Sequence, residues 1–300
     1  MWFCRFLLSC FFIVAAFTAG HCTTVYTDAV GRSIVLAAPP QRIVSLVPSV
    51  TEILYAIHAQ QQLVGVTDFC TYPRAASAKA SVGAYASPSL EAVANLTPDL
   101  IIMGMSSSSP VLLQQFEQLG VPVYIVAPRS TASTLDTISS LGQLTGHEDV
   151  AQPLVAQLRE QMALIRSQRG EHQVRTLVCV MIEPLIVAGG GTLADDLITV
   201  AGGVNVAAQQ ERYPTWGMEA VLAYDPELIV VSVHPGTPML KDYFLQWPQL
   251  QAVRKQQVVT INADWLQRPG PRLFNGLREL ARYFSSVNKV TVRKVADVRN

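Results

Sequence analysis

An internal repeat constrains the fold of this 300-residue chain more than any other feature of its sequence. Residues 91–102 read Glu-Ala-Val-Ala-Asn-Leu-Thr-Pro-Asp-Leu-Ile-Ile, and residues 219–230 read Glu-Ala-Val-Leu-Ala-Tyr-Asp-Pro-Glu-Leu-Ile-Val. Each copy has the pattern of a short helix, a turn that contains proline, and a buried strand. One such unit in each half of the chain predicts two related lobes.

Short apolar runs alternate with amphipathic stretches through the rest of the chain, as in parallel sheets with crossover helices. The runs are almost continuously apolar, which strands buried on both faces require. The strands predicted for the first lobe are 43–47, 63–66, 100–103 and 123–126, and those for the second are 176–182, 228–232 and 258–262. The fold class that we expect is therefore α/β, with two Rossmann-like lobes.

A helical stripe of apolar residues lies between the two sets of strands. It includes Val150, Leu154 and Leu158, which recur at steps of three and four. A helix of roughly 20 residues is ~30 Å long, about the diameter of one lobe. An ordinary crossover helix also fits this pattern, but the central position favours a rigid spine between the lobes.

The chain then divides into five parts. They are a signal peptide (1–20), an extended or hairpin N-terminal extension (21–41), an N-terminal α/β lobe (42–146), a linking helix (147–170) and a C-terminal α/β lobe (171–300).

The first part has the layout of a secretory signal peptide. Arg5 precedes an apolar run at 6–17, and the small residues Thr18, Ala19 and Gly20 follow. The run is shorter than the ~20 residues that span a bilayer. A membrane anchor is the alternative, and Cys22 also raises lipid attachment, which His21 fits poorly. We expect a cleaved, periplasmic product.

Composition and motifs argue against several function classes. The formal net charge is zero and no basic patch stands out, so no nucleic-acid partner is expected. The five histidines are scattered, which disfavours a metal site built from them. The glycine-rich segment 188–192 has no lysine after it and is a weak phosphate loop. No catalytic motif is present, so we expect neither an enzyme nor a cofactor.

Three cysteines remain after residue 20, namely Cys22, Cys70 and Cys179. An odd number leaves at least one thiol unpaired in an oxidising compartment, and the sequence does not fix the pairing. Cys179 lies in an apolar run, where a buried thiol is expected.

Aromatic and polar residues gather in loops beside the predicted strands. Open α/β sheets form their ligand crevice at the carboxyl ends of strands, and aromatic walls suit a large, planar, mostly apolar ligand. Ordinary packing is the alternative for each aromatic. The candidate ligand-binding residues are Phe69, Tyr85, Tyr213, Asp264, Trp265, Leu266, Gln267 and Arg268.

Three glutamates open predicted helices. Ser49 and Glu52 have the spacing of a capping box. Glu91 and Glu219 lie in the first turn of the two repeated helices, where a carboxylate complements the helix dipole. Helix stability alone explains each of them. The same glutamate in both lobes also indicates two related docking points.

Several motifs in order carry a resemblance that extends from Arg42 to about Leu280. The motifs are Arg42-Ile-Val-Ser-Leu-Val-Pro-Ser-Val-Thr-Glu52, Thr71-Tyr-Pro73, Gly202-Gly-Val-Asn205 and Ala263-Asp-Trp265. They resemble the cobalamin, haem and ferric-siderophore receptors of bacterial ABC importers, and within that family the vitamin B12-binding group. The resemblance implies a class III periplasmic binding protein, in which a single long α-helix joins two lobes that close little.

The resemblance also implies functional roles. The ligand-contacting loops fall on Phe69, Tyr85 and 264–268, and Glu91 and Glu219 match glutamates that meet arginines of the ABC permease. We expect a monomer that binds cobalamin or a related corrinoid. Phe69, Tyr85 and Gln267 depart from the B12 receptor's tyrosine, tryptophan and glutamate, so a ferric-siderophore or haem receptor is the alternative. From another class, an exported α/β enzyme of metal-chelatase type would use His58, His147, His172 or His234.

The N-terminal pattern predicts that the mature protein is soluble and begins near His21. N-terminal sequencing of protein from the periplasmic fraction checks this expectation. Retention of Met1, or a lipid on Cys22, would contradict it.

Overall fold

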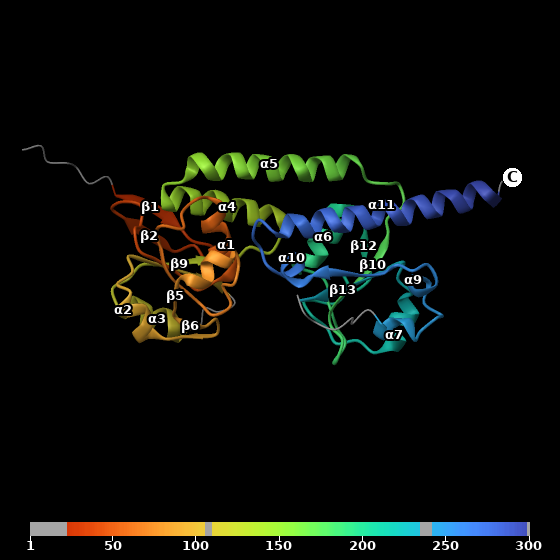
Figure 1. The fold of residues 1–300 in the computed structure, drawn as a ribbon, viewed down its shortest axis with the longest axis horizontal. Helices are drawn as coiled ribbons and strands as arrows, with labels where there is room; N and C mark the ends of the chain where they lie inside the picture. Colours follow the sequence, from red (N-terminus) through yellow and green to blue (C-terminus); the bar gives the residue numbers. More distant parts are fainter. Residues whose placement is uncertain (1–22, 106–109, 235–241, 299–300) are drawn as a thin grey trace, which may run out of the picture.

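The computed structural model describes residues 23–105, 110–234 and 242–298, so the predicted signal peptide and Cys22 lie outside the described residues. The described chain forms two α/β lobes side by side, with long helices laid across both of them (Figure 1). Across these ranges, no helix combines the length and the apolar character that crossing a membrane requires.

The N-terminal lobe is built on a five-stranded parallel sheet in the order β5-β4-β3-β8-β9. Its strands are β3 (Ile43–Ser45), β4 (Leu63–Val66), β5 (Ala80–Ser81), β8 (Leu100–Gly104) and β9 (Val123–Val126). Its helices are α1 (Pro48–Ala56), a 3-10 turn (Arg74–Ala78), α2 (Leu90–Asn95) and α3 (Pro110–Gln118). Two hairpins flank the sheet, β1 (Thr24–Thr27) with β2 (Ser33–Leu36) and β6 (Gly83–Ala84) with β7 (Ser87–Pro88).

The C-terminal lobe has the sheet order β11-β10-β13-β14, with β12 also paired to β10. All pairs are parallel except β10 with β11. The strands are β10 (Arg175–Met181), β11 (Ile186–Val187), β12 (Val204–Asn205), β13 (Leu228–Val233) and β14 (Val258–Asn262). The helices are α6 (Leu193–Ala201), α7 (Met218–Tyr224), α8 (Asp242–Leu245), α9 (Gln251–Arg254), α10 (Ala263–Gln267) and α11 (Leu273–Val298). The seven strands predicted from the apolar runs are therefore confirmed.

The internal repeat is confirmed as α2 with β8 and α7 with β13. Ser89 caps α2 by accepting a hydrogen bond from the backbone of Ala92 at 3.2 Å. Gly217 precedes α7 without a side-chain cap. Both repeated strands lie inside their sheets and are almost completely buried.

The capping box predicted for α1 is wrong. The helix begins at Pro48 after Val47, and no side chain caps it. Proline suits the first helical position because its φ is already helical and it has no N–H to satisfy there. Ser49 is consequently inside the helix, and Glu52 pairs with Arg272 of the other lobe.

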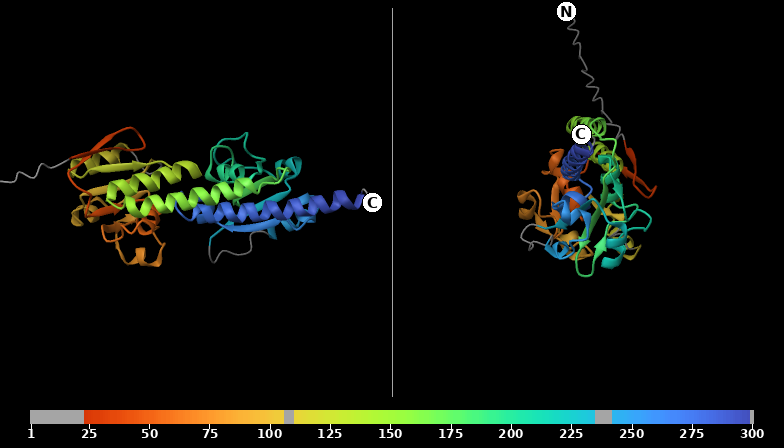
Figure 2. Two further views of the ribbon diagram at one scale, coloured as in Figure 1. Left: turned by 90° about the horizontal axis from the view of Figure 1, so that it is seen from above. Right: turned by 90° about the vertical axis from the view of Figure 1, so that its right-hand side faces the viewer.

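Long helices form a spine over both lobes. They are α4 (Thr131–Thr145), α5 (Glu148–Ser167) and α11, and the last two run side by side in the view from above (Figure 2). A single hydrophobic cluster includes Leu54 of the N-terminal lobe, Leu158 of α5 and Leu197 of the C-terminal lobe. The interpretation of the 147–170 segment as a spine is thus supported, because its apolar face belongs to a core that both lobes share.

Two leucines of α5 test this shared core. Leu158 is 6% exposed, whereas Leu164 is 55% exposed. We expect Leu158→Ala to lower the free energy of unfolding by ~2–5 kcal/mol, because the substitution leaves a cavity in the core. Leu164→Ala should change it by less than ~0.5 kcal/mol. Denaturant unfolding of both variants measures the difference, and equal losses would contradict the burial of α5 against both lobes.

Candidate functional site

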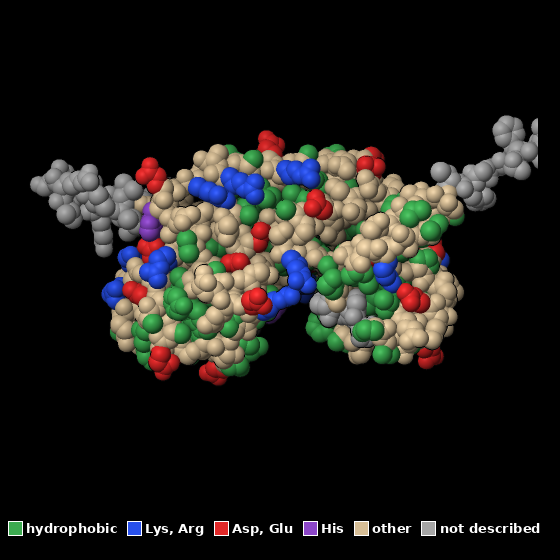
Figure 3. All heavy atoms as spheres, turned by 180° about the vertical axis from the view of Figure 1, so that it is seen from behind, with side chains coloured by type: hydrophobic (Ala, Val, Ile, Leu, Met, Phe, Trp, Pro, Cys, Tyr) green, Lys and Arg blue, Asp and Glu red, His purple; other side chains and the backbone are tan. Residues whose placement is uncertain are grey.

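A cleft of about 950 Å³ lies between the lobes. Figure 3 shows the corresponding hollow from behind, with Lys and Arg side chains at its edge. The N-terminal lobe lines it with residues that follow β3, β4, β8 and β9 and with the β6–β7 turn, and the C-terminal lobe adds 191–193, 212–213 and 267–269. The cleft therefore lies mainly at the carboxyl ends of parallel strands, where open α/β sheets bind ligands.

Aromatic side chains from both lobes line the cleft. Phe69 and Tyr85 belong to the N-terminal lobe and Tyr213 to the C-terminal lobe. Tyr213 is 48% exposed, so part of its ring is available for contact. Burial of the rest raises the pKa of the phenol, despite the opposing charge of Arg212. Tyr213 is therefore a neutral hydrogen-bond donor at physiological pH.

The predicted segment 264–268 divides between the cleft and the interior. Gln267 and Arg268 line the cleft, and Gln267 donates a hydrogen bond to Ser232 Oγ at 2.8 Å. Leu266 is fully buried in the shared core, and Trp265 is half-buried against it. Helix geometry explains the difference, because successive residues of α10 point in different directions. Trp265 and Leu266 are therefore not among the residues that line the cleft.

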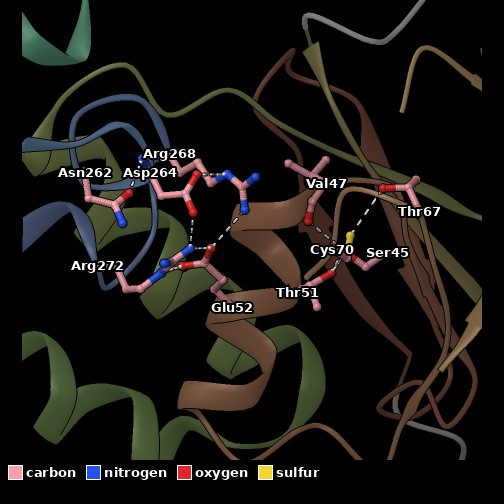
Figure 4. A network of polar contacts seen from close by, with 10 residues as sticks. All are labelled: Ser45, Val47, Thr51, Glu52, Thr67, Cys70, Asn262, Asp264, Arg268 and Arg272. Atoms are coloured by element: carbon pink, nitrogen blue, oxygen red, sulfur yellow. Dashed lines mark hydrogen bonds and ion pairs between the residues drawn. The ribbon is translucent and has the colours of Figure 1, made fainter. Parts of the chain in front are cut away.

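The remaining predicted residue, Asp264, belongs to a polar network between the lobes (Figure 4). Arg272 donates to the two carboxylate oxygens of Glu52 at 2.8 and 2.6 Å and to Asp264 at 3.0 Å. Arg268 Nε lies 2.9 Å from Asp264. Burial lowers the pKa of Arg272, but the hydrogen bonds and charges of Glu52 and Asp264 outweigh burial, so that pKa is raised overall.

A second polar network fixes the loop that carries Phe69 (Figure 4). Thr51 of α1 donates to Ser45 Oγ at 2.9 Å or to Cys70 Sγ at 3.2 Å. Thr67 Oγ1 lies 3.3 Å from the same sulfur. Cys70 and Cys179 are both buried free thiols, and burial raises the pKa of the Cys179 thiol. The residues on either side of Phe69 are therefore anchored to α1.

Two arginines of the cleft, Arg129 and Arg212, are not among the residues that the sequence predicts, whereas Arg268 is. Arg129 and Arg212 line the cleft with Arg268, whereas no Asp or Glu of the described chain does. Single charged residues in loops carry no periodic signal, so only their position after β9 and beside Tyr213 offers a clue. Arg268 is already paired with Asp264. The guanidinium groups of Arg129 and Arg212, in a cleft that no carboxylate of the described chain lines, therefore favour a ligand that carries anionic or other acceptor oxygens.

The alternative of a metal-dependent enzyme finds no support in the site. Of the residues that the structure describes, no histidine lines the cleft, and no group of His, Cys, Asp and Glu has the arrangement of a metal site. His172 instead lies 2.9 Å from Glu227. In the glycine-rich segment, Gly189 allows close backbone packing, because a Cβ there would clash with the carbonyl oxygen of Gln210, whereas Gly191 and Thr192 line the cleft.

Neither of the two repeat glutamates lines the cleft. Glu91 and Glu219 are exposed in the first turns of α2 and α7. These helices lie in different lobes, on the side of the molecule opposite to α5 (Figure 1). One repeat helix of each lobe, with an exposed glutamate in its first turn, therefore lies on this side of the molecule.

The comparison with known protein families shows which family the chain belongs to. The model of a family described as periplasmic binding protein matches residues 43–265, which include every cleft-lining segment except 267–269. The chain belongs to the periplasmic binding protein family. Members of this family bind a solute and do not transform it, so the expectation that the chain is not an enzyme is confirmed.

Relatives of this periplasmic binding protein include B12 and haem binders. A vitamin B12-binding protein of Vibrio cholerae is 30% identical over 84% of this chain and 91% of its own length. The solved structure of a periplasmic vitamin B12-binding protein of Vibrio cholerae matches with a TM-score of 0.75 at 30% identity, covering 84% of this chain and 99% of that one. A periplasmic haem-binding protein of a Roseiflexus species matches with a TM-score of 0.73 at 28% identity, covering 82% and 98%.

The comparisons also confirm the fold class, two α/β lobes of the class III periplasmic binding protein type. A small-molecule ligand and a periplasmic location follow from the same family membership.

Proposed function

We propose that this periplasmic binding protein takes up cobalamin or a related corrinoid in its interlobe cleft and delivers it to an ABC permease. The observation that carries the proposal is the cleft itself, which both lobes line with aromatic side chains. Its volume of about 950 Å³ lies at the upper end of the ~300–1,000 Å³ range of small-molecule sites, as a ligand of corrinoid size requires. The relatives named for vitamin B12 support the choice of ligand.

Export to the periplasm and the oligomeric state of the mature protein belong to the same proposal. We infer that residues 1–20 are a cleaved signal peptide and that the mature receptor is a monomer with no nucleic-acid partner or cofactor. The lobe boundaries at 42–146 and 171–300, with 147–170 between them, are part of this proposal.

Haem is the second candidate ligand, and the cleft arginines favour it. Haem carries two carboxylates on a flat apolar ring, and Arg129 and Arg212 line the same cleft as the aromatic side chains, where they can pair with carboxylates. Solved haem-binding relatives at 25–28% identity support this alternative.

Titration of the purified receptor with cobalamin and with haem distinguishes the candidates. We expect tight cobalamin binding, which Tyr213→Ala weakens by ~1–3 kcal/mol because apolar burial and stacking are lost. Tyr224→Ala is the control, since Tyr224 is 38% exposed in the same lobe but stacks on Trp216 outside the cleft. Binding of haem alone would replace the first candidate by the second. An unchanged Kd in Tyr213→Ala would remove this ring from the site.

We propose that Glu91 and Glu219 dock the receptor on its permease. Two equivalent helices on one outer side, one per lobe, allow a pseudo-twofold receptor to sit across a twofold permease, with each carboxylate facing an arginine. Charge-assisted pairs of this kind fix register and association rate.

The double variant Glu91→Ala with Glu219→Ala is expected to bind cobalamin normally but not to stimulate uptake by its importer at physiological salt. Truncating one partner of a desolvated interface pair costs ~2–5 kcal/mol. The control is Glu148→Ala with Glu160→Ala, two exposed glutamates of α5 on the opposite side of the molecule. If uptake with the first double variant equals that with the control, the repeat glutamates serve only their helices.

A further inference from the structure

We propose that Glu52 is a positioning residue for the cleft, an N-terminal-lobe carboxylate that holds arginines of the C-terminal lobe and so fixes the separation of the two cleft walls. The inference rests on the proposed function only in its binding readout. Glu52 lies on α1, and its side chain is 1% exposed. Its partner Arg272 is 220 residues further along the chain, in the other lobe.

The pair is held from several sides. Arg272 contacts both oxygens of Glu52, also binds Asp264, and lies 4.0 Å over the ring of Tyr72. Gly270 sits against the same turn of α1, since a Cβ there would be 3.4 Å from the carbonyl oxygen of Ser49. The segment that follows α10 therefore docks on α1 by backbone contact as well as by charge.

The contacts of Glu52 with the two arginines lie directly beside the cleft. Arg268 lines the cleft, and so do Pro48 and Ser49, one helical turn before Glu52. Arg268 Nη1 is 3.5 Å from Glu52 Oε1, close enough for an ion pair, although it makes no hydrogen bond to any described residue. One arginine is thus part of the cleft wall and of the connection between the lobes.

Charge and burial make the connection resistant to opening. If the lobes separated at this point, Glu52 would lose its arginines and remain a poorly solvated carboxylate, which is strongly unfavourable. Thr51, the residue before Glu52, hydrogen-bonds to Ser45 and Cys70 of the N-terminal lobe. Helix α1 is therefore bound to its own lobe through Thr51 and to the C-terminal lobe through Glu52. Asp196 of α6 adds a second tie by accepting a hydrogen bond from the backbone of Thr131 at 2.6 Å.

A purely structural role for Glu52 predicts lower stability with unchanged lobe spacing, so the test measures spacing. Spin labels at Ala94→Cys on α2 and Ala223→Cys on α7 report the separation of the lobes, in a chain that also carries Cys22→Ser. Both alanines are exposed, whereas Cys70 and Cys179 are buried. Glu52→Gln keeps the side-chain shape and removes the charge.

Asp28→Asn is the matched control, because Asp28 is a buried carboxylate whose partner Arg32 lies in the same N-terminal extension, so that this pair does not connect the lobes. We expect narrow distance distributions for the parent and for Asp28→Asn, changed little by cobalamin. Glu52→Gln should show a broader and longer distribution, and its cobalamin dissociation rate should rise by about 5- to 150-fold, the range of coupling between linked sites. Arg272→Lys keeps the charge but loses the two-pronged contact, so its distance distribution and dissociation rate should lie between those of the parent and of Glu52→Gln. This variant replaces Glu52→Gln in the test if Glu52→Gln does not fold.

Equal distributions in Glu52→Gln, Asp28→Asn and the parent would overturn the proposal, as would an unchanged dissociation rate in Glu52→Gln when cobalamin binds the parent. If cobalamin binds none of these proteins, the proposed ligand fails, while the distance distributions still decide whether Glu52 sets the spacing of the lobes.

Discussion

The apolar face of α5 is buried against α4 of one lobe and against α6 and α11 of the other, and this shared core limits what the two lobes can do. A hinge of a few loop residues would let two separate cores swing apart. Here, by contrast, any large rotation of one lobe has to expose side chains such as Leu158 and Leu277, which are buried in one cluster. The cleft is therefore present before a ligand arrives, and binding depends on the side chains that already line it.

The lining of the cleft combines aromatic rings with guanidinium groups, which contribute to ligand binding in different ways. Aromatic rings bury a large flat ligand without specifying its orientation, whereas guanidinium groups require acceptor oxygens at defined places. Phe69 and Tyr213 supply the first kind from opposite lobes, and Arg129 and Arg212 supply the second. For the proposed ligand, we therefore expect orientation and affinity to come from different residues.

Local patterns predicted the elements of the fold, and contacts between distant segments decided the rest. Seven strands and the α5 helix follow from the order of apolar residues within each segment. Glu52 was misassigned because its capping spacing is local, whereas Arg272 lies 220 residues further on. Trp265 and Gln267 are two residues apart in one short helix, and only packing determines which of them reaches the cleft. No sequence pattern predicts Arg129 and Arg212, because single charged residues in loops have no periodicity and these two come together only in the folded cleft between the lobes.

The burial of Cys70 and Cys179 limits their reaction with thiol reagents in the folded protein. Cys70 is enclosed by hydroxyl groups of Thr51 and Thr67, and Cys179 lies inside the second sheet. One sits in each lobe, and neither can react with a thiol reagent until its lobe opens, because reaction needs access and a thiolate. The rate at which each thiol is alkylated in dilute denaturant therefore reports how often its lobe opens. The two alkylation rates are equal only if the lobes unfold as one unit.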